Sequence, residues 1–308
     1  MTQKSKAAFR VSNVRVSITG LVRLLRPTHW IKNLFVLAGL FFSSDWRQPG
    51  LVAHALAAFA AFCLAASAVY GMNDALDVEE DREHPRKRLR PIASGLVPRN
   101  LALTLSGALA LSSLVLSACT GSALLWIIVA YLAINILYSR ALKNQVLLDV
   151  FCIASGFILR LLAGTFGIGI EPSQWFLLCT LALSLFLGFS KRYAELVDPQ
   201  RPLEEKRKVL KKYSSKFLRM LLGITLSATL ITYALYTTSS RTLEIHHTGN
   251  LLYTLPLVIF GLFRYLYLVI EDGFGENTVA DLLKDKQLLF ASVLYVIGTG
   301  SLLFLRSS

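Results

Sequence analysis

Residues 51–84 read LVAHALAAFAAFCLAASAVYGMNDALDVEEDREH, an apolar block that runs directly into a cluster of acidic side chains. Residues 51–70 include no Asp, Glu, Lys or Arg, and about 20 apolar residues suffice for a helix to cross a bilayer. Negative charge gathered at the end of a membrane span is unfavourable, so it indicates a functional site. The stretch therefore predicts a membrane helix that carries carboxylates to one surface of the bilayer.

Apolar blocks of this kind recur along the whole chain of 308 residues, of which 54% are hydrophobic and 17% are charged. A typical soluble domain has about 25% charged residues, so this composition excludes a disordered chain and most soluble enzymes. The blocks are too long and continuous for the alternating strands of a membrane β-barrel. We therefore predict an all-α, polytopic membrane protein. The nine predicted transmembrane helices are 31–44, 51–70, 101–119, 121–138, 146–168, 174–190, 217–238, 250–270 and 287–305.

Basic residues are concentrated on one side of these spans. If the N-terminus is cytoplasmic, 27 of the 32 Lys and Arg residues fall in cytoplasmic segments, as expected for a protein of the cytoplasmic (inner) membrane. The C-terminus then lies outside, and the net charge of +13 reflects topology rather than nucleic-acid binding. The longest polar loops, 71–100 and 191–216, are both cytoplasmic, so we expect the active site there. The predicted parts are a basic amphipathic segment, 1–30, and a nine-helix catalytic domain, 31–305.

The acidic cluster has the spacing of one helix face. Asn73, Asp77 and Asp81 stand four residues apart, and Asp74 flanks them. Carboxylate oxygens without His or Cys suit Mg²⁺, which binds proteins through one or two carboxylates together with substrate phosphates. A solvated acidic helix end is the alternative, but it does not explain why the cluster lies at the mouth of a span. We therefore predict that Asp74, Asp77 and Asp81 bind Mg²⁺ and are catalytic.

Basic residues follow the acidic cluster at once, among them Lys87 and Arg90. Anchoring of a cytoplasmic loop would explain these cations, but not their position beside the carboxylates. A metal site next to Lys and Arg side chains is suited to a diphosphate, because the metal and the cations neutralise different oxygens. The pattern predicts a diphosphate-containing substrate.

The string N-D-x-x-D-x-x-x-D-x-x-H-P-x-K-x-x-R-P-I-x-x-G, from Asn73 to Gly95, resembles the first motif of the UbiA superfamily of intramembrane prenyltransferases. This resemblance implies a nine-helix bundle whose cytoplasm-facing cavity binds a diphosphate through Mg²⁺. Typical members carry a second acidic motif after the sixth span, but residues 188–196 read GFSKRYAEL here. Lys191 and Arg192 stand where carboxylates would be, which favours a simpler anion, such as a monophosphate, at this position.

Further segments between Arg26 and Leu289 resemble the branch of the superfamily that joins 5-phosphoribosyl diphosphate (PRPP) to a polyprenyl phosphate. The resemblance implies transfer of phosphoribosyl to a decaprenyl-type phosphate with release of diphosphate, toward a cell-envelope (arabinan) precursor. Prenyl transfer to an aromatic or other lipid-soluble acceptor is the alternative, and the missing second acidic motif counts against it. A third interpretation is a transporter or a structural membrane protein. The position of the long polar loops on one side of the membrane counts against it.

The remaining predicted contacts lie near the cytoplasmic ends of the spans. Lys191 and Arg192, with Lys143, are expected to hold the lipid phosphate, although they could be ordinary membrane anchors. Arg160 lies inside a span and should pair with Asp149 or a substrate phosphate. The predicted substrate-binding residues are Asn73, Lys32, Lys87, Arg90, Tyr138, Lys143, Arg160, Lys191 and Arg192. Small residues on lipid-facing helices would also permit a homo-oligomer.

Overall fold

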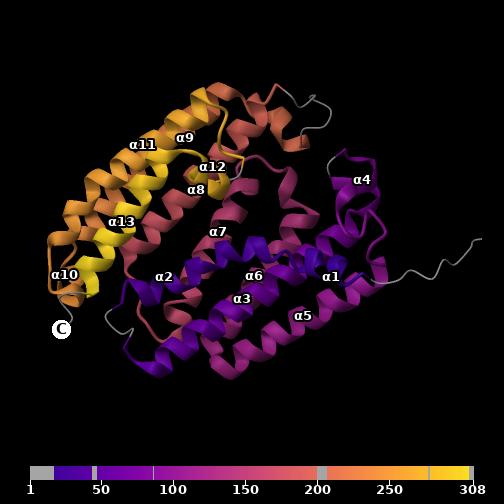
Figure 1. Cartoon of the computed structure of the whole chain (residues 1–308), viewed down its shortest axis with the longest axis horizontal. Coiled ribbons are helices and arrows are strands. Elements are labelled where there is room, and N and C mark those ends of the chain that lie inside the picture. Colours follow the sequence, from indigo (N-terminus) through magenta and orange to yellow (C-terminus); the bar gives the residue numbers. More distant parts are fainter. Residues whose placement is uncertain (1–16, 44–46, 86, 200–206, 277, 305–308) are drawn as a thin grey trace, which may run out of the picture.

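The computed structural model describes residues 17–43, 47–85, 87–199, 207–276 and 278–304. Every regular element within these ranges is helical. Figure 1 shows α9, α11 and α13 side by side at one edge of the molecule, and α3 and α5 together at the opposite edge, with α6, α7 and α8 between them. The prediction of an all-α membrane protein is confirmed.

Eight helices in the described part of the chain are long and apolar enough to cross a membrane. They are α3 (Pro49–Leu76), α5 (Arg99–Thr120), α6 (Ser122–Arg140), α7 (Leu148–Ala163) with the 3₁₀ helix η4 (Phe166–Ile168), α8 (Gln174–Val197), α9 (Ser215–Thr238), α11 (Leu255–Glu271) with η6 (Asn250–Thr254) before it, and α13 (Lys286–Phe304). The shorter helices that join them are α4 (Val78–Glu83), η2 (Lys87–Leu89), η3 (Leu142–Asn144), η5 (Lys208–Lys212), α10 (Ser240–His246) and α12 (Thr278–Lys284).

The first predicted transmembrane helix, 31–44, is divided in the structure between a 3₁₀ helix and a short α-helix. α1 (Ile18–Leu25) ends at Arg26, whose backbone is left-handed (φ 52°, ψ 58°), and an eight-residue 3₁₀ helix, η1 (Pro27–Leu34), follows. Within the described part of the predicted span, only α2 (Phe35–Phe41) is α-helical. It is about 10 Å long at 1.5 Å per residue, which is too short to cross a bilayer. The polar residues of η1 explain the difference, because Asn33 is completely buried among protein groups rather than facing lipid.

Close backbone contact fixes α2 against α7. A Cβ atom added at Gly164 would lie 1.5 Å from the carbonyl oxygen of Val36, and one at Gly39 would meet the Gly164 carbonyl. Only glycine permits such an approach of two helices. This contact places the segment that contains η1 and α2 beside the middle of the bundle.

The polar connections gather at one end of the bundle, which we call the motif end. α3, α6, α8 and α11 end there, and α5, α7, α9 and α13 begin there. Among the described residues of these connections, η3 between α6 and α7 contacts η5 between α8 and α9. As predicted, the acidic cluster and the end of α8 lie at the same end of the bundle.

Candidate active site

Asp74 lies in the last turn of α3 and is only 2% exposed. The Nη2 atom of Arg26 lies 2.7 Å from both of its carboxylate oxygens, and Nη1 of Arg90 lies 3.0 Å from Oδ1. The Arg26 guanidinium also stacks over the Tyr70 ring, 5.0 Å from its centroid. Arg26 was not among the predicted site residues, because nothing in the sequence indicates that the turn after α1 meets α3.

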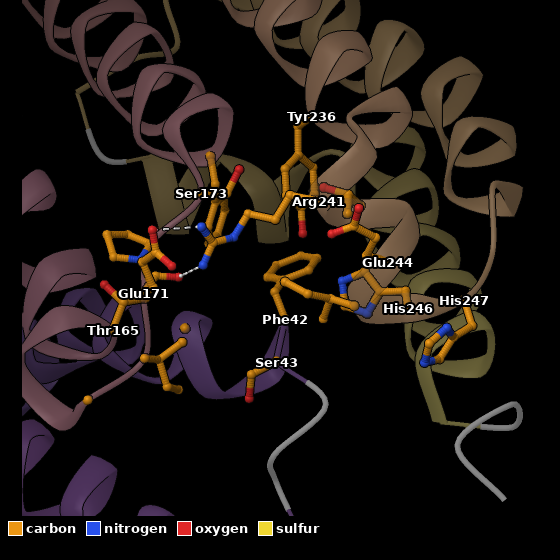
Figure 2. A pocket seen from close by; sticks show the side chains of 17 residues that line it. Phe42, Ser43, Thr165, Glu171, Ser173, Tyr236, Arg241, Glu244, His246 and His247 are labelled. Atoms are coloured by element: carbon orange, nitrogen blue, oxygen red, sulfur yellow. Dashed lines mark hydrogen bonds and ion pairs between the residues drawn. The ribbon is translucent and has the colours of Figure 1, made fainter.

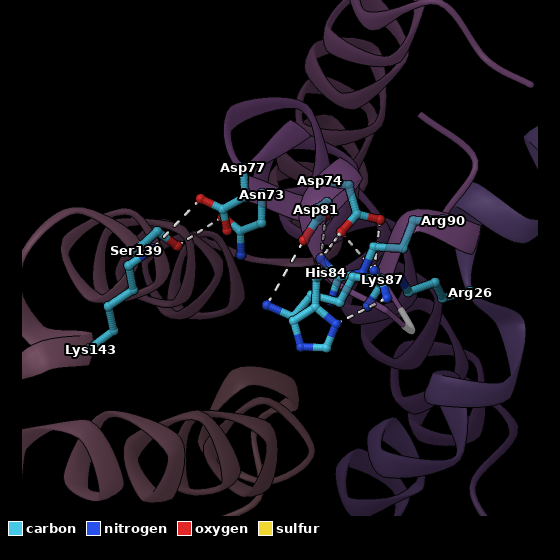
Figure 3. A network of polar contacts seen from close by, with 10 residues as sticks. All are labelled: Arg26, Asn73, Asp74, Asp77, Asp81, His84, Lys87, Arg90, Ser139 and Lys143. Atoms are coloured by element: carbon cyan, nitrogen blue, oxygen red, sulfur yellow. Dashed lines mark hydrogen bonds and ion pairs between the residues drawn. The ribbon is translucent and has the colours of Figure 1, made fainter. Parts of the chain in front are cut away.

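Asp81, on α4, shares Arg90 with Asp74 (Figure 3). Nη1 of Arg90 lies 2.7 Å from Asp81 Oδ2, and Nζ of Lys87 lies 3.8 Å from Oδ1. Burial and the neighbouring charge of Arg90 lower the pKa of Lys87. Oδ1 of Asp81 is buried and accepts no hydrogen bond, because Lys87 at 3.8 Å lies beyond hydrogen-bond distance. This oxygen is therefore available for a closer donor or a metal ion.

Asp77 and Asn73 have different partners from Asp74 and Asp81. Asp77 Oδ1 lies 3.6 Å from Nζ of Lys143, and the Ser139 hydroxyl donates to Asn73 Oδ1 at 2.8 Å. α3 ends at Leu76, so the motif is divided between α3 and α4 instead of continuing as one helix. The predicted single stripe is therefore two adjacent pairs, Asp74 with Asp81 and Asn73 with Asp77. The end of α6 and η3 contact the second pair (Figure 3).

The donor set of this cluster fits Mg²⁺. Hard carboxylate oxygens are its preferred ligands, and Asp81 has one buried oxygen that accepts no hydrogen bond. Within the described ranges, no three His, Cys, Asp or Glu side chains are already arranged around one point. Arg26, Arg90, Lys87 and Lys143 balance the carboxylates in this state.

Arg192, at the position of the family's second acidic motif, is buried in a network of ion pairs. Its Nε donates to Asp149 Oδ2 at 2.6 Å, and its Nη1 donates to Glu195 Oε2 at 2.8 Å. The Tyr213 hydroxyl donates to the other Asp149 oxygen at 2.8 Å. The network joins α8 to the start of α7 and to the residue after η5, whereas Lys191 beside it is partly exposed.

Arg160 is buried in α7, but its expected pairing with Asp149 is wrong, because Asp149 pairs with Arg192. Its Nε donates to Asn33 Oδ1 at 2.8 Å, and its Nη2 donates to the Tyr131 hydroxyl at 3.2 Å. Hydrophobicity alone could not reveal these contacts, because Asn33 and Arg160 are 127 residues apart.

Lys32 is exposed on η1 and lies near Lys191. His29 lies in the same positively charged region. Burial, together with three neighbouring positive charges, lowers the pKa of its imidazole to about 4. Those charges are Lys32, Arg26 and Lys191. The Tyr138 hydroxyl accepts a hydrogen bond from Arg207 at 3.3 Å.

Most of the predicted site residues fall into two groups. Seven gather around the acidic motif: Asn73, Asp74, Asp77, Asp81, Lys87, Arg90 and Lys143. In the second group, Lys32 lies within electrostatic reach of both Lys191 and Arg160. Tyr138 and Arg192 belong to neither group, because their contacts are with Arg207 and with Asp149 and Glu195. None of these residues lines the pocket of about 430 Å³ at the other end of the bundle (Figure 2), where Arg241 pairs with the exposed Glu171 at 2.9 Å.

The motif, its cations and the helical bundle agree with a known family. The profile of the UbiA prenyltransferase family matches residues 33–275. The chain belongs to the UbiA prenyltransferase family. The resemblance inferred from the acidic motif is thereby confirmed. At the position where the resemblance leads us to expect a second acidic motif, this chain has Lys191 and the buried Arg192.

Two UbiA relatives share most of their length with this chain. Decaprenyl-phosphate phosphoribosyltransferase from Mycolicibacterium smegmatis is 37% identical over 293 residues, which cover 91% of this chain and 92% of the relative. The protein of the same name from Corynebacterium glutamicum is 41% identical over 222 residues, which cover 70% and 67%. The resemblance to the phosphoribosyltransferase branch is confirmed.

Solved UbiA structures have the same fold. A UbiA homolog from Archaeoglobus fulgidus bound to GPP and Mg²⁺ superimposes with a TM-score of 0.69 at 20% identity, covering 92% of this chain and 99% of that one. The same homolog bound to DMAPP and Mg²⁺ gives a TM-score of 0.68 at 19% identity, covering 92% and 98%. At this identity the likeness concerns the fold alone.

Proposed function

We propose that this protein transfers 5-phosphoribosyl from PRPP to a polyprenyl phosphate of the decaprenyl type and releases diphosphate. The identity to two decaprenyl-phosphate phosphoribosyltransferases supports this activity. One observation favours it over prenyl transfer, namely the single acidic centre. The end of α8 has Lys191 and a buried, carboxylate-paired Arg192, where a prenyl diphosphate would need a second metal site. The product would serve as a precursor of cell-envelope arabinan.

Asp74, Asp77 and Asp81 would hold Mg²⁺ at the diphosphate of PRPP. When bound, the ion supplies positive charge to the leaving group. Asn73, fixed by Ser139, would orient a ligand beside it. Arg90 and Lys87 would then donate to diphosphate oxygens, since they already lie beside Asp81, one of the carboxylates that would bind the metal.

Departure of the diphosphate leaves positive charge on C1 of the ribose, which nearby carboxylates stabilise. The acceptor phosphate is already anionic, so its oxygen can attack C1 without a general base. Lys191 would hold this phosphate with Lys143 on the side of the acidic motif, while Arg192 keeps the end of α8 in place. Tyr138 would add a hydroxyl donor near this path.

The distribution of basic residues supports a cytoplasmic motif end and an outer C-terminus in the cytoplasmic membrane. Both substrates fit this placement, because PRPP is water-soluble and the polyprenyl phosphate keeps its anionic group at the membrane surface. Assembly into a homo-oligomer stays a prediction.

Isothermal titration of the purified protein in detergent tests the choice of donor. We expect PRPP to bind only with Mg²⁺, and a prenyl diphosphate to bind much more weakly. Tight binding of the prenyl diphosphate, with turnover of an aromatic acceptor and no binding of PRPP, would instead support the alternative of prenyl transfer.

A further inference from the structure

The 3₁₀ helix η1 has two distinct sides. Runs of 3₁₀ helix longer than three or four residues are uncommon, and η1 has eight. With three residues per turn, His29 and Lys32 lie on one side, in line with Arg26 before the helix. Trp30 and Asn33 lie on another. The first set has two cations, Arg26 and Lys32, with a neutral imidazole at His29 between them. The second set makes the contacts with the protein interior.

The interior side of η1 is anchored along α3. The Trp30 indole donates to Ser67 Oγ at 3.1 Å, and the Asn33 amide donates to Cys63 Sγ at 3.3 Å. Ser67 and Cys63 are four residues apart, so they are successive positions on one face of α3. Two anchors one turn apart fix both the position and the rotation of η1.

Arg160 completes this anchor from α7. Each of its three guanidinium nitrogens donates to a protein acceptor, which are Asn33 Oδ1, the Gly156 carbonyl and the Tyr131 hydroxyl. The rings of Phe62, Tyr131 and Phe157 lie 5.1–5.6 Å from the guanidinium carbon. Within the described part of the chain, no carboxylate pairs with Arg160. Neutral hydrogen-bond acceptors and aromatic rings therefore stabilise its charge. All three nitrogens donate to protein groups.

The other side of η1 connects the two groups of site residues. At its start, Arg26 contacts Asp74 of the acidic motif. His29 packs edge-on against Tyr70, with ring centroids 5.1 Å apart. Lys32 is exposed and within electrostatic reach of Lys191 on α8. Arg26 and Lys32 therefore place two positive charges along this side of η1, and the first of them lies at the acidic motif.

We propose that Asn33 and Arg160 are positioning residues that fix η1, and that Lys32, on the outer side of this helix, binds a phosphate monoester group of a substrate. The inference rests on the proposed function, which supplies two such groups, the 5-phosphate of PRPP and the phosphate of the lipid. An exposed ammonium group on a fixed helix can donate charge-assisted hydrogen bonds to a phosphate dianion. Arg160 itself does not touch the substrate.

The variant Lys32→Met tests the site and identifies its occupant. Steady-state kinetics with purified protein, PRPP and polyprenyl phosphate should show a KM at least about tenfold higher for one substrate, because a hydrogen bond to a charged group is lost. An increase for PRPP alone assigns the 5-phosphate, and an increase for the lipid alone assigns the lipid phosphate. Unchanged KM values for both substrates would overturn the inference.

A double-mutant cycle tests the positioning role. Asn33→Leu should raise the same KM as Lys32→Met, and the double variant should be no worse than Lys32→Met alone. Multiplied losses in the double variant would overturn the positioning role. Arg160→Lys gives a second measurement, since it keeps the positive charge but loses the planar guanidinium group and its three donor nitrogens. It should behave like Asn33→Leu, whereas full activity with Lys would mean that charge alone matters.

Two controls separate this inference from folding defects and from the proposed function. Lys284→Met removes an exposed lysine on α12 and should leave both KM values unchanged. Each variant is compared with the wild type by size-exclusion profile and thermal unfolding, and only variants with the wild-type profile enter the cycle. Wild-type protein that transfers no phosphoribosyl contradicts the proposed function, whereas active wild type with unaffected Lys32→Met contradicts only this inference.

Discussion

Two arginines, Arg26 and Arg90, form ion pairs with the carboxylates of Asp74 and Asp81. Arg90 lies within 3.0 Å of an oxygen of Asp74 and within 2.7 Å of an oxygen of Asp81, and Arg26 holds Asp74 from the other side. In both ion pairs with Asp74 the carboxylate is nearly buried, whereas the arginine side chain is partly exposed. We therefore expect the arginines to turn toward an incoming diphosphate while the carboxylates stay in place.

Replacement of one carboxylate by its amide should abolish turnover without unfolding the protein. Asp74→Asn and Asp77→Asn remove charge but keep side-chain volume, so we expect at least about a hundredfold loss of kcat. The matched control is Glu79→Gln in the same segment, whose partner Arg82 is an exposed surface neighbour and contributes little. Near-normal activity of both aspartate variants at limiting Mg²⁺ would contradict the metal assignment.

Lys191 and Arg192 are neighbours in the sequence but should have separate roles. Arg192→Gln leaves the buried carboxylates of Asp149 and Glu195 without their cation, so we expect about 3–5 kcal/mol of destabilisation in detergent unfolding experiments. Lys191→Gln should keep the wild-type stability and raise the KM for polyprenyl phosphate. The reverse pattern would show that the buried network does not carry the stability of α8.

At the scale of elements, the long helices were predictable and the segment before α3 was not. Apolar length identified the spans from α3 to α13, because each must cross the bilayer. The 3₁₀ helix η1 has no such signal, since its conformation depends on Asn33 meeting Arg160 and Trp30 meeting Ser67. The division of the acidic motif at Asp77 was missed for the same reason. Residues four apart predict one helix face, but Lys143 and Arg90 draw the carboxylates to different sides.

The contact of α2 with α7 can be tested at one glycine. In Gly164→Ala the added Cβ would collide with the Val36 carbonyl, so we expect about 1–3 kcal/mol of destabilisation or more. Gly107→Ala on α5 is the matched control, because a Cβ there meets nothing within 4 Å. Alanine should leave that helix as stable as before or slightly more stable. Equal thermal unfolding of the two variants would show that α2 is not held in this position.

For the whole molecule, the bundle places the two proposed binding centres on different helices. The acidic motif belongs to α3 and α4, and Lys191 belongs to α8. The acidic centre was predicted from the spacing of its charges, and Lys191 and Arg192 from the resemblance to the family's second motif. The sequence could not predict that Arg192 would be buried or that Arg26 would join the acidic motif. Those outcomes depend on which helices pack together, and composition does not determine helix neighbours.

This separation has a stereochemical consequence. If diphosphate and lipid phosphate flank the ribose, the acceptor oxygen attacks C1 opposite to the leaving group, and the α configuration of PRPP becomes β in the product. NMR of the anomeric proton and carbon in the isolated lipid measures this outcome. A retained α linkage would require two displacements, with a carboxylate of the acidic motif as the nucleophile.

The most direct test of the central claim is transfer of label from PRPP to lipid. Purified protein in detergent is incubated with ribose-labelled PRPP and decaprenyl phosphate, with and without Mg²⁺, and the organic extract is analysed by mass spectrometry. We predict a labelled polyprenyl-phosphoryl-5-phosphoribose that forms only when Mg²⁺ and both substrates are present. Absence of label in the lipid, under conditions where the protein is folded and binds Mg²⁺ with PRPP, would contradict phosphoribosyl transfer as its function.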